Sequence, residues 1–550
     1  MLTKHPKAAR RAFALAAAAA VTALGVPAAA QSAAAAEGEV STVGIRASVT
    51  VAKMLRHERA LQAIADTYGG GNRLAGTIGY DKSGEYVEAQ LRSWGYEPVR
   101  HNFRFTLVAE RTPSVLTQIT PTPTTYVNGV DFAIMTYSGS GDVTAAVQAV
   151  DLVVPMPADA PASTSTSGCE AADFAGFGPG NIALLQRGLC TFGVKADNAK
   201  AAGAAGVIVM NEGQEALGRA GLLSGTLGEP PRTLPVVGTS YTHGVDLANG
   251  VTNGITGSTV RLRTDTIAED RDTFNILAET RGGNPNSVMV VGAHLDSVAR
   301  GPGINDNGSG SAGILEIARA IAMDPEYADP ATGIRNKVRF AWWGAEEHGL
   351  IGSTRYVSSL GADELAKIKL NLNFDMIASP NYGRFVYDGD NSQFPVSGGS
   401  AEGPAGSGEI ERIFHDYFGS VALASEETAF SGRSDYGPFI ARGIPAGGLF
   451  TGAEGVKTAA QVAKFGGTAG VAYDRCYHLG CDTLANLNLT GFEEMADAAA
   501  HTALTLAYRD LVQRPLVDPA GPVGPAGGTG TGSGGGLHSD DDHDHDPVSS

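Results

Sequence analysis

The chain has 550 residues, of which 43% are apolar and 18% are charged, enough for two or three domains with sizeable cores. Its net charge is −18 and its pI is near 5.1. This balance argues against a nucleic-acid or anionic-membrane partner, because such partners favour a basic face. It fits a soluble protein.

The first residues have the order of a targeting segment. Basic residues lie between positions 4 and 11, an Ala-rich apolar stretch covers 12–26, and small residues follow. We predict that residues 1–36 are a signal peptide and that the chain is secreted, with no membrane attachment after cleavage. A membrane anchor is the alternative, but the run is short and alanine is weakly apolar. "RRAFAL" at 10–15 resembles a twin-arginine signal, so the export route stays open.

The next elements are read from hydrophobic periodicity. Helical spacing predicts helices within 48–98, separated by the loop "GGGNRLAGTIGY". From about 143, short β-like runs alternate with Pro- and Ser-rich loops. From about 265, strands such as "SVMVVGAHLD" and "KLNLNFDMI" alternate with helices such as "SAGILEIARAIA", and a closing helix covers 486–512. We predict an α/β fold with a mainly parallel mixed sheet flanked by helices.

The last segment changes composition. Residues 515–550 are rich in Gly, Asp and His and poor in apolar side chains. We predict a disordered tail, because little apolar surface is available to offset the entropy of ordering. A solubilising role is favoured over weak binding of a divalent metal.

The four cysteines fall into two regions. Cys169 and Cys190 lie in one, and Cys476 and Cys481 in the other. An even number in an exported chain predicts two disulfides, each local to its own domain. Four buried thiols are the alternative.

Ligand-type side chains follow the predicted core strands or lie in the loops beside them. They are His294, Asp296, Asp306, Glu346, Glu347, Asp375 and His478. In open α/β sheets, ligand sites gather at the carboxyl ends of the strands, so we expect these side chains to converge. A mixed imidazole and carboxylate set suits zinc, with manganese or cobalt as substitutes. There are enough ligands for two zinc ions about 3.5–4 Å apart that share a bridging carboxylate.

Seven motifs occur in one order: "GNRLAGTIGYDKSGEYV", "GAHLDS", "GINDNGSG", "GAEEHGLIGS", "NFDMI", "SGRSDYGPF" and "CYHLGCDT". Together they resemble the secreted two-zinc aminopeptidases, that is, the bacterial leucyl-aminopeptidase and aminopeptidase-Y-like metallopeptidases. The resemblance covers roughly 45–142 and 265–510. It implies a zinc exopeptidase-like fold.

The stretch between these parts resembles a small α/β protease-associated domain. The resemblance rests on "NIALLQRGLCTFGVKADNAKAAGAAGVIVMNE" and "LPVVGTSYTHG". We therefore predict a peptidase domain in two segments, 37–142 and 265–514, interrupted by an inserted domain at 143–264. Cys190 would pair with Cys169 inside the insertion. Whether the insertion is more than a spacer or lid stays open.

The resemblance also implies ligand roles. His294 and Asp375 would hold one zinc, Glu347 and His478 would hold the other, and Asp306 would bridge them, with a water completing the site. Members of the family sometimes bind a structural calcium ion, but the sequence contains no clear calcium-binding loop.

The resemblance also implies roles for further residues in the reaction and in substrate binding. Glu346 would be the general base for the metal-bridging water, and Asp296 would orient His294. Tyr477 would donate to the oxyanion, with plain packing as the alternative. Arg433 and Phe450 would line the substrate cleft, although a structural salt bridge is also open for Arg433.

The resulting prediction is an exported zinc aminopeptidase that acts on peptides with large apolar N-terminal residues, as a monomer. A carboxypeptidase- or dipeptidase-like exopeptidase on the same scaffold is the alternative, because both chemistries use the same ligands. A single-zinc glutaminyl cyclase is disfavoured by the presence of both His294 and Asp375. A binding module with an inactive site is disfavoured by Glu346 and Tyr477.

Overall fold

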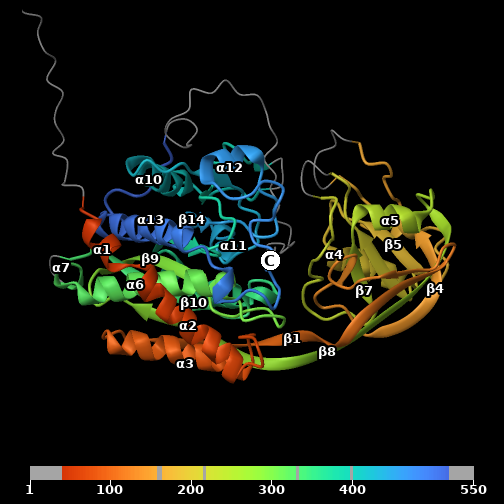
Figure 1. Ribbon diagram of the computed structural model, residues 1–550, viewed down its shortest axis with the longest axis horizontal. Helices are drawn as coiled ribbons and strands as arrows, with labels where there is room; N and C mark the ends of the chain where they lie inside the picture. The colour runs from red at the N-terminus through yellow and green to blue at the C-terminus, as the bar shows by residue number, and fades with distance from the viewer. Residues whose placement is uncertain (1–39, 158–163, 215–218, 330–332, 397–399, 520–550) are drawn as a thin grey trace, which may run out of the picture. The chain divides into compact units, whose positions relative to one another are not determined.

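The computed structural model describes residues 40–157, 164–214, 219–329, 333–396 and 400–519 (Figure 1). The predicted signal peptide, 1–36, and most of the predicted tail, 515–550, lie outside these residues. Within the described part, no helix combines the length and apolar character needed to cross a membrane.

The helices of the described residues are α1 (Val43–Ser48), α2 (Val51–Thr67), α3 (Ile78–Ser93), α4 (Phe192–Ala201), α5 (Tyr241–Ala248), α6 (Gly310–Met323), α7 (Pro325–Ala328), α8 (Ile351–Ser359), α9 (Ala362–Leu365), α10 (Ser407–Ser420), α11 (Gly437–Ile440), α12 (Ala459–Phe465) and α13 (Leu489–Tyr508). Helices α2, α3, α6 and α13 correspond to the helical segments read from the sequence, and the other helices were not identified there. Helices α2 and α3 lie within the predicted 48–98 segment, and α13 lies within the predicted closing helix.

The strands form one continuous hydrogen-bonded sheet. They are β1 (Val99–Thr120), β2 (Thr124–Tyr126), β3 (Phe132–Ile134), β4 (Gly141–Ala149), β5 (Ile182–Gln186), β6 (Gly206–Met210), β7 (Val236–Thr239), β8 (Gly254–Glu279), β9 (Asn284–His294), β10 (Asn336–Trp343), β11 (Ile368–Phe374), β12 (Phe385–Tyr387), β13 (Glu426–Thr428) and β14 (Ala446–Phe450).

The peptidase part of the sheet has a parallel centre. Strands β14, β11, β9 and β10 are neighbours in that order and run parallel, whereas β12 and β8 pair with them antiparallel. Residues 287–294 of β9 are buried without a break, as expected for a central strand covered on both faces. The predicted mainly parallel mixed sheet is confirmed.

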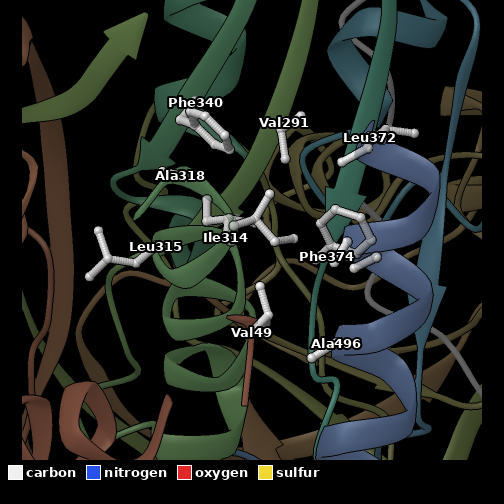
Figure 2. Close-up of a cluster of buried hydrophobic side chains, with 14 of the residues drawn as sticks. Val49, Val291, Ile314, Leu315, Ala318, Phe340, Leu372, Phe374 and Ala496 are labelled. Atoms are coloured by element: carbon white, nitrogen blue, oxygen red, sulfur yellow. The ribbon is translucent and has the colours of Figure 1, made fainter. Parts of the chain in front are cut away.

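The main hydrophobic core lies between this parallel centre and helices α6 and α13 (Figure 2). Ile314 of α6 packs in the same cluster as Val291 of β9, Phe340 of β10 and Phe374 of β11. Ala496 of α13 belongs to this cluster as well. All five are at most 1% exposed. Burying a side chain of the larger kind contributes about 1.5–3 kcal/mol, so these contacts fix the strand ends that carry the ligand residues.

Two long strands join the peptidase part to the inserted part. Strand β1 pairs antiparallel with β8 from Val99 to Thr120. One end of β8 pairs with β10, and its other end pairs with β4, where the sheet continues through β5, β6, β7 and β3. The boundary predicted at 264/265 therefore lies inside a strand. Neither long strand was identified from the sequence, because strands of globular proteins usually have about 5–6 residues.

The inserted part is a small α/β unit. Helices α4 and α5 accompany the parallel strands β5, β6 and β7, and two hydrophobic clusters enclose this part of the sheet. Cys169 and Cys190 form a disulfide here, and Cys476 and Cys481 form the other in the peptidase part. Both predicted pairings are confirmed.

Candidate metal centre

Neighbouring parallel strands deliver the acidic and histidine side chains to one edge of the sheet. His294 is the last residue of β9, Asp375 directly follows β11, and Glu346 begins the turn after β10. The backbone of Ala345 is left-handed, with φ of +57°, which turns the chain sharply at the end of β10. The strands are adjacent and parallel, so their carboxyl ends meet.

Two loops supply the remaining candidates. Asp306 lies in the turn Ile304–Ser309 that precedes α6. The carboxylate of Asp482 accepts hydrogen bonds from the backbone N–H groups of Asn305 (2.8 Å) and Asp306 (3.0 Å), which holds this turn in place. His478 lies in the loop closed by the Cys476–Cys481 disulfide.

Asp306 lies between the two histidines. Its Oδ1 is 3.2 Å from Nε2 of His294, and its Oδ2 is 3.2 Å from Nε2 of His478. Nε2 of His294 is also 3.3 Å from Oδ1 of Asp375, and Nε2 of His478 is 3.1 Å from Oε2 of Glu347. The structure therefore brings all five predicted metal ligands together, in two halves that share Asp306.

Glu346 lies beside the first half. Its Oε2 is 3.8 Å from Nε2 of His294, and its residue is 5% exposed. Burial raises the pKa of Glu346 well above its ordinary value, and nearby Asp435 and Asp375 add to this shift. Burial likewise raises the pKa of Glu347.

The pKa values of the two histidines are also raised, although burial by itself would lower them. Burial lowers the pKa of His294, but the carboxylates of Asp375 and Glu346 outweigh it and raise this pKa well above its ordinary value. Burial also lowers the pKa of His478, but Glu347 and Asp306 raise it to about 10. The site is thus a buried concentration of negative charge, which attracts cations.

Two carboxylate oxygens of the site lack a hydrogen bond within the described part of the chain, which matches a metal centre. Oε1 of Glu347 and Oδ1 of Asp375 are buried and make no hydrogen bond with the described residues. Two groups of candidate ligand atoms lie within 4.8 Å of one another: His294 with Asp306 and Glu347, and His294 with Glu346 and Asp375. Buried carboxylates need a counter-charge. The mixed nitrogen and oxygen donors fit zinc.

Asp296 contacts His294 and the backbone of both adjacent glutamates. Its backbone oxygen is 3.2 Å from Nδ1 of His294, and its carboxylate Oδ1 is 3.7 Å from the same atom. The carboxylate also accepts the backbone N–H groups of Glu346 (3.2 Å) and Glu347 (3.4 Å). Asp296 therefore contacts both the β9 end and the turn after β10.

The predicted substrate residues line one cavity of about 150 Å³ together with the metal candidates. Arg433 donates from Nη2 to the hydroxyl oxygen of Tyr477 (2.9 Å) and pairs with Glu454 (3.2 Å). Arg433 therefore lines the cavity and also forms a salt bridge, the two roles that the sequence left open. Phe450 lines the cavity at the end of β14.

The inserted part contributes to the same cavity. Ser224, Gly225 and Thr226 of the insertion are among its lining residues, and so is Thr136, which follows β3 and precedes the predicted start of the insertion at 143. Only the tertiary structure brings these positions to the cavity, since the sequence has no ligand-type motif there.

Sequence reasoning missed three supporting residues. Ser434 donates to Oδ2 of Asp375 (2.6 Å), and the adjacent Asp435 is fully buried, with its pKa raised to about 7 by burial. Arg73 is fully buried and donates to the backbone oxygens of Leu295, Pro302 and Gly303. All three lie inside motifs quoted above, but no local pattern indicates what they contact.

Comparison with known proteins agrees with this architecture. Residues 275–503 match peptidase family M28, and residues 148–247 match the PA domain. An aminopeptidase of Pseudomonas aeruginosa strain UCBPP-PA14 is 47% identical over 463 residues, covering 84% of this chain and 82% of the relative. The chain belongs to peptidase family M28, and it is a peptidase with an inserted PA domain.

Two further relatives support the same assignment. Leucine aminopeptidase 2 of Trichophyton equinum is 42% identical, covering 78% of each chain. The solved structure of an aminopeptidase from Aneurinibacillus sp. strain AM-1 superposes with a TM-score of 0.65 at 26% identity, covering 87% of this chain and 98% of that one.

Proposed function

We propose that this peptidase is an exported zinc aminopeptidase that removes one N-terminal residue at a time and prefers large apolar residues. The observation that carries the proposal is Asp306, whose two carboxylate oxygens face two different histidines at 3.2 Å each. Such a carboxylate suits a pair of metal ions. The relatives named aminopeptidase and leucine aminopeptidase support the reaction class.

The ligands divide between the two halves of the centre. His294 and Asp375 would hold one zinc, His478 and Glu347 would hold the other, and Asp306, which lies between the two histidines, would serve both. Bound zinc supplies Lewis acidity, which polarises the scissile carbonyl and lowers the pKa of water.

Glu346 is the general base. It lies beside the ligands and within the cavity, where its carboxylate accepts the proton of the attacking water and passes it to the leaving amine. Tyr477 donates its phenolic proton to the oxyanion, and Arg433, which donates to the same oxygen, orients the phenol.

The charges of the cavity favour an N-terminal substrate over a C-terminal one. A free α-amine is cationic and is attracted to Glu346 and Asp375. A terminal carboxylate calls for a cluster of arginines, whereas Arg433 is the one arginine among the described lining residues and is already paired with Glu454. The carboxypeptidase-like alternative is therefore less favoured.

The cavity wall supports an apolar preference. Met376, Tyr387, Tyr436 and Phe450 are among the residues that line it. Burying a Leu- or Phe-sized side chain against such a wall contributes about 1.5–3 kcal/mol.

Export and assembly are further parts of the proposal. The basic and Ala-rich start of the chain supports secretion after cleavage near residue 36, and sequencing the N-terminus of the culture-medium protein tests this. The chain acts on peptides as a monomer, which light scattering of the purified enzyme tests.

The central experiment compares leucine, phenylalanine, glutamate and lysine anilides with acetyl-leucine anilide. We expect rapid hydrolysis of the first two, slow hydrolysis of the acetylated compound, and loss of activity after chelation that added zinc restores. Equal turnover of the acetylated compound, or release of residues from a C-terminus, would overturn the aminopeptidase assignment. Full activity after complete zinc removal would overturn the proposal that these residues form a catalytic metal centre.

A further inference from the structure

A second cluster of ligand-type side chains lies on helix α10 and strand β13, apart from the ligands of the catalytic centre. Glu411 and His415 are one turn apart on α10, so their side chains share a face. Glu427 lies on β13. One ligand atom from each of these three residues lies within 4.8 Å of the others.

Two atoms of this cluster are buried without a partner. Oε1 of Glu411 and Nε2 of His415 make no hydrogen bond with the described residues, and their side chains are 0% and 1% exposed. They are 3.6 Å apart, which is too long for a hydrogen bond between them. A proton on either atom therefore could not form a hydrogen bond to the other, and both atoms would stay unsatisfied.

The opposite atom of each side chain is held in place. Oε2 of Glu411 accepts the backbone N–H of Gly389 (2.9 Å), and Nδ1 of His415 is 2.8 Å from Oγ of Ser425. This anchoring aims Oε1 and Nε2 into one shared space. A hydrogen bond at the far nitrogen is the usual way in which a metal-ligating histidine is oriented.

Burial makes ionisation of the two carboxylates unfavourable, and a bound cation would offset this cost. Burial raises the pKa of Glu411 to about 9, with Glu427 adding to the shift, and burial raises the pKa of Glu427 to about 8. Burial lowers the pKa of His415 to about 4, and its Nε2 faces Oε1 of Glu411 at 3.6 Å. Asp388 and Asp390 lie beside Glu411 and add negative potential.

We propose that Glu411, His415 and Glu427 bind a zinc ion at a structural site separate from the catalytic centre. Two carboxylates and an imidazole are a donor set that suits zinc. The ion removes the cost of burying unpaired polar atoms and links α10 to β13. The proposal does not depend on the reaction that the enzyme catalyses.

The site lies next to the aromatic wall of the substrate cavity. Tyr387, which lines that cavity, directly precedes Asp388 and stacks on Phe430 with ring centroids 5.2 Å apart. Asp388 in turn accepts backbone N–H groups of residues 392–394. A zinc ion in the cluster therefore stiffens the support of this wall.

The test is a zinc count on the full-length enzyme, stripped with a chelator, reloaded with excess zinc and desalted. Wild type should retain one zinc per chain more than Glu411→Gln and one more than His415→Gln. Asp416→Asn is the matched control, because it neutralises an exposed carboxylate next to His415 on the same helix and should retain as much zinc as wild type. Equal zinc in wild type and in both folded variants would overturn the proposal.

Thermal denaturation provides a second measurement. Added zinc should raise the midpoint of wild type more than that of the variants, because a ligand stabilises only the state that binds it. If the α10 variants fail to fold by circular dichroism, Glu427→Gln replaces them, and retention of all the zinc by this variant would contradict the site. Stabilisation by calcium alone, unchanged in His415→Gln, would also contradict it.

Discussion

Glu346 and Glu347 are neighbours in the chain, but their carboxylates lie in different halves of the centre. Oε2 of Glu346 approaches His294 at 3.8 Å, whereas Oε2 of Glu347 approaches His478 at 3.1 Å. The backbone N–H groups of both are held by the carboxylate of Asp296. A single turn thus presents two identical groups to different partners.

Replacing these two glutamates separates their roles. Glu346→Gln should keep its zinc and lose about 10²–10⁴-fold in kcat, because general bases contribute factors of this size. Glu347→Gln should instead lose zinc, since it removes a ligand. Zinc analysis and leucine-anilide kinetics measure both effects, and the reverse pattern would show that the assignment is wrong.

Arg73 acts at a distance from the reacting atoms. Its guanidinium reaches the backbone oxygens of the loop that joins His294 to Asp306, including Pro302 (2.8 Å) and Gly303 (2.6 Å). Arg73→Met should destabilise the fold by at least about 3 kcal/mol, because several buried acceptors lose their donor. Zinc affinity should fall as well, since the loop carries Asp306.

Urea denaturation and zinc titration of this variant check the prediction. Arg59→Met is the control, because Arg59 is exposed on α2 and the same substitution there should change stability little. Equal stability of the two variants would refute the role given to Arg73.

Phe450 tests the substrate preference. Phe450→Ala should lower kcat/KM for leucine and phenylalanine anilides by about tenfold, since loss of roughly 1.4 kcal/mol of apolar contact corresponds to that factor. Alanine anilide should change little, because its methyl group buries little surface. A uniform loss across all three substrates would place Phe450 outside the side-chain pocket.

At the scale of the element, the loop Cys476–Cys481 carries Tyr477 and His478. Its disulfide closes a sequence separation of 5, whereas the Cys169–Cys190 disulfide in the inserted part closes one of 21. Stabilisation grows with loop length, from about 2 kcal/mol for the shorter loop to about 3 kcal/mol for the longer one. Removal of the longer bridge should therefore affect mainly the free energy of unfolding, and removal of the shorter bridge mainly kcat.

The prediction compares two double variants. Replacing Cys476 and Cys481 by Ser should lower kcat by about tenfold or more, because misplacing catalytic groups by about 1 Å costs up to 10²-fold. Replacing Cys169 and Cys190 by Ser should lower the free energy of unfolding more and kcat less. The idea fails if the first pair of substitutions leaves leucine-anilide turnover unchanged.

At the scale of the molecule, residues of the inserted part line the cavity that contains His294 and Glu346. The cavity therefore depends on the path of β1 and β8, which connect the two parts through one sheet. We therefore expect substrates that extend beyond the first residues to meet this wall, and short peptides to be preferred over folded proteins.

Ser224→Trp should sharpen this preference. The larger side chain narrows the cavity at the inserted part, so kcat/KM for a leucine-initiated hexapeptide should fall about tenfold more than for leucine anilide, which corresponds to roughly 1.4 kcal/mol. Leu189→Trp is the control, because Leu189 is 69% exposed and does not line the cavity. Equal effects of Ser224→Trp on both substrates would exclude a role of the inserted part in length selection.

The sequence alone determined the parallel centre of the sheet and most of the candidate centre. Continuous apolar strands such as β9 and β11 are local patterns, and His294 and Asp375 stand at their ends. The general rule that ligands gather at such ends was sufficient to predict their convergence. The order of the motifs then indicated the family.

Only the tertiary structure decided which distant residues support or extend the site. Arg73 contacts Leu295, which is 222 residues away, and Glu411 meets Glu427 only because α10 packs against β12, which pairs with β13. Thr136 and Ser224 reach the cavity through the long strands β1 and β8. A sequence pattern records the periodicity of one element, whereas contacts between elements depend on sheet order and packing, which no single segment encodes.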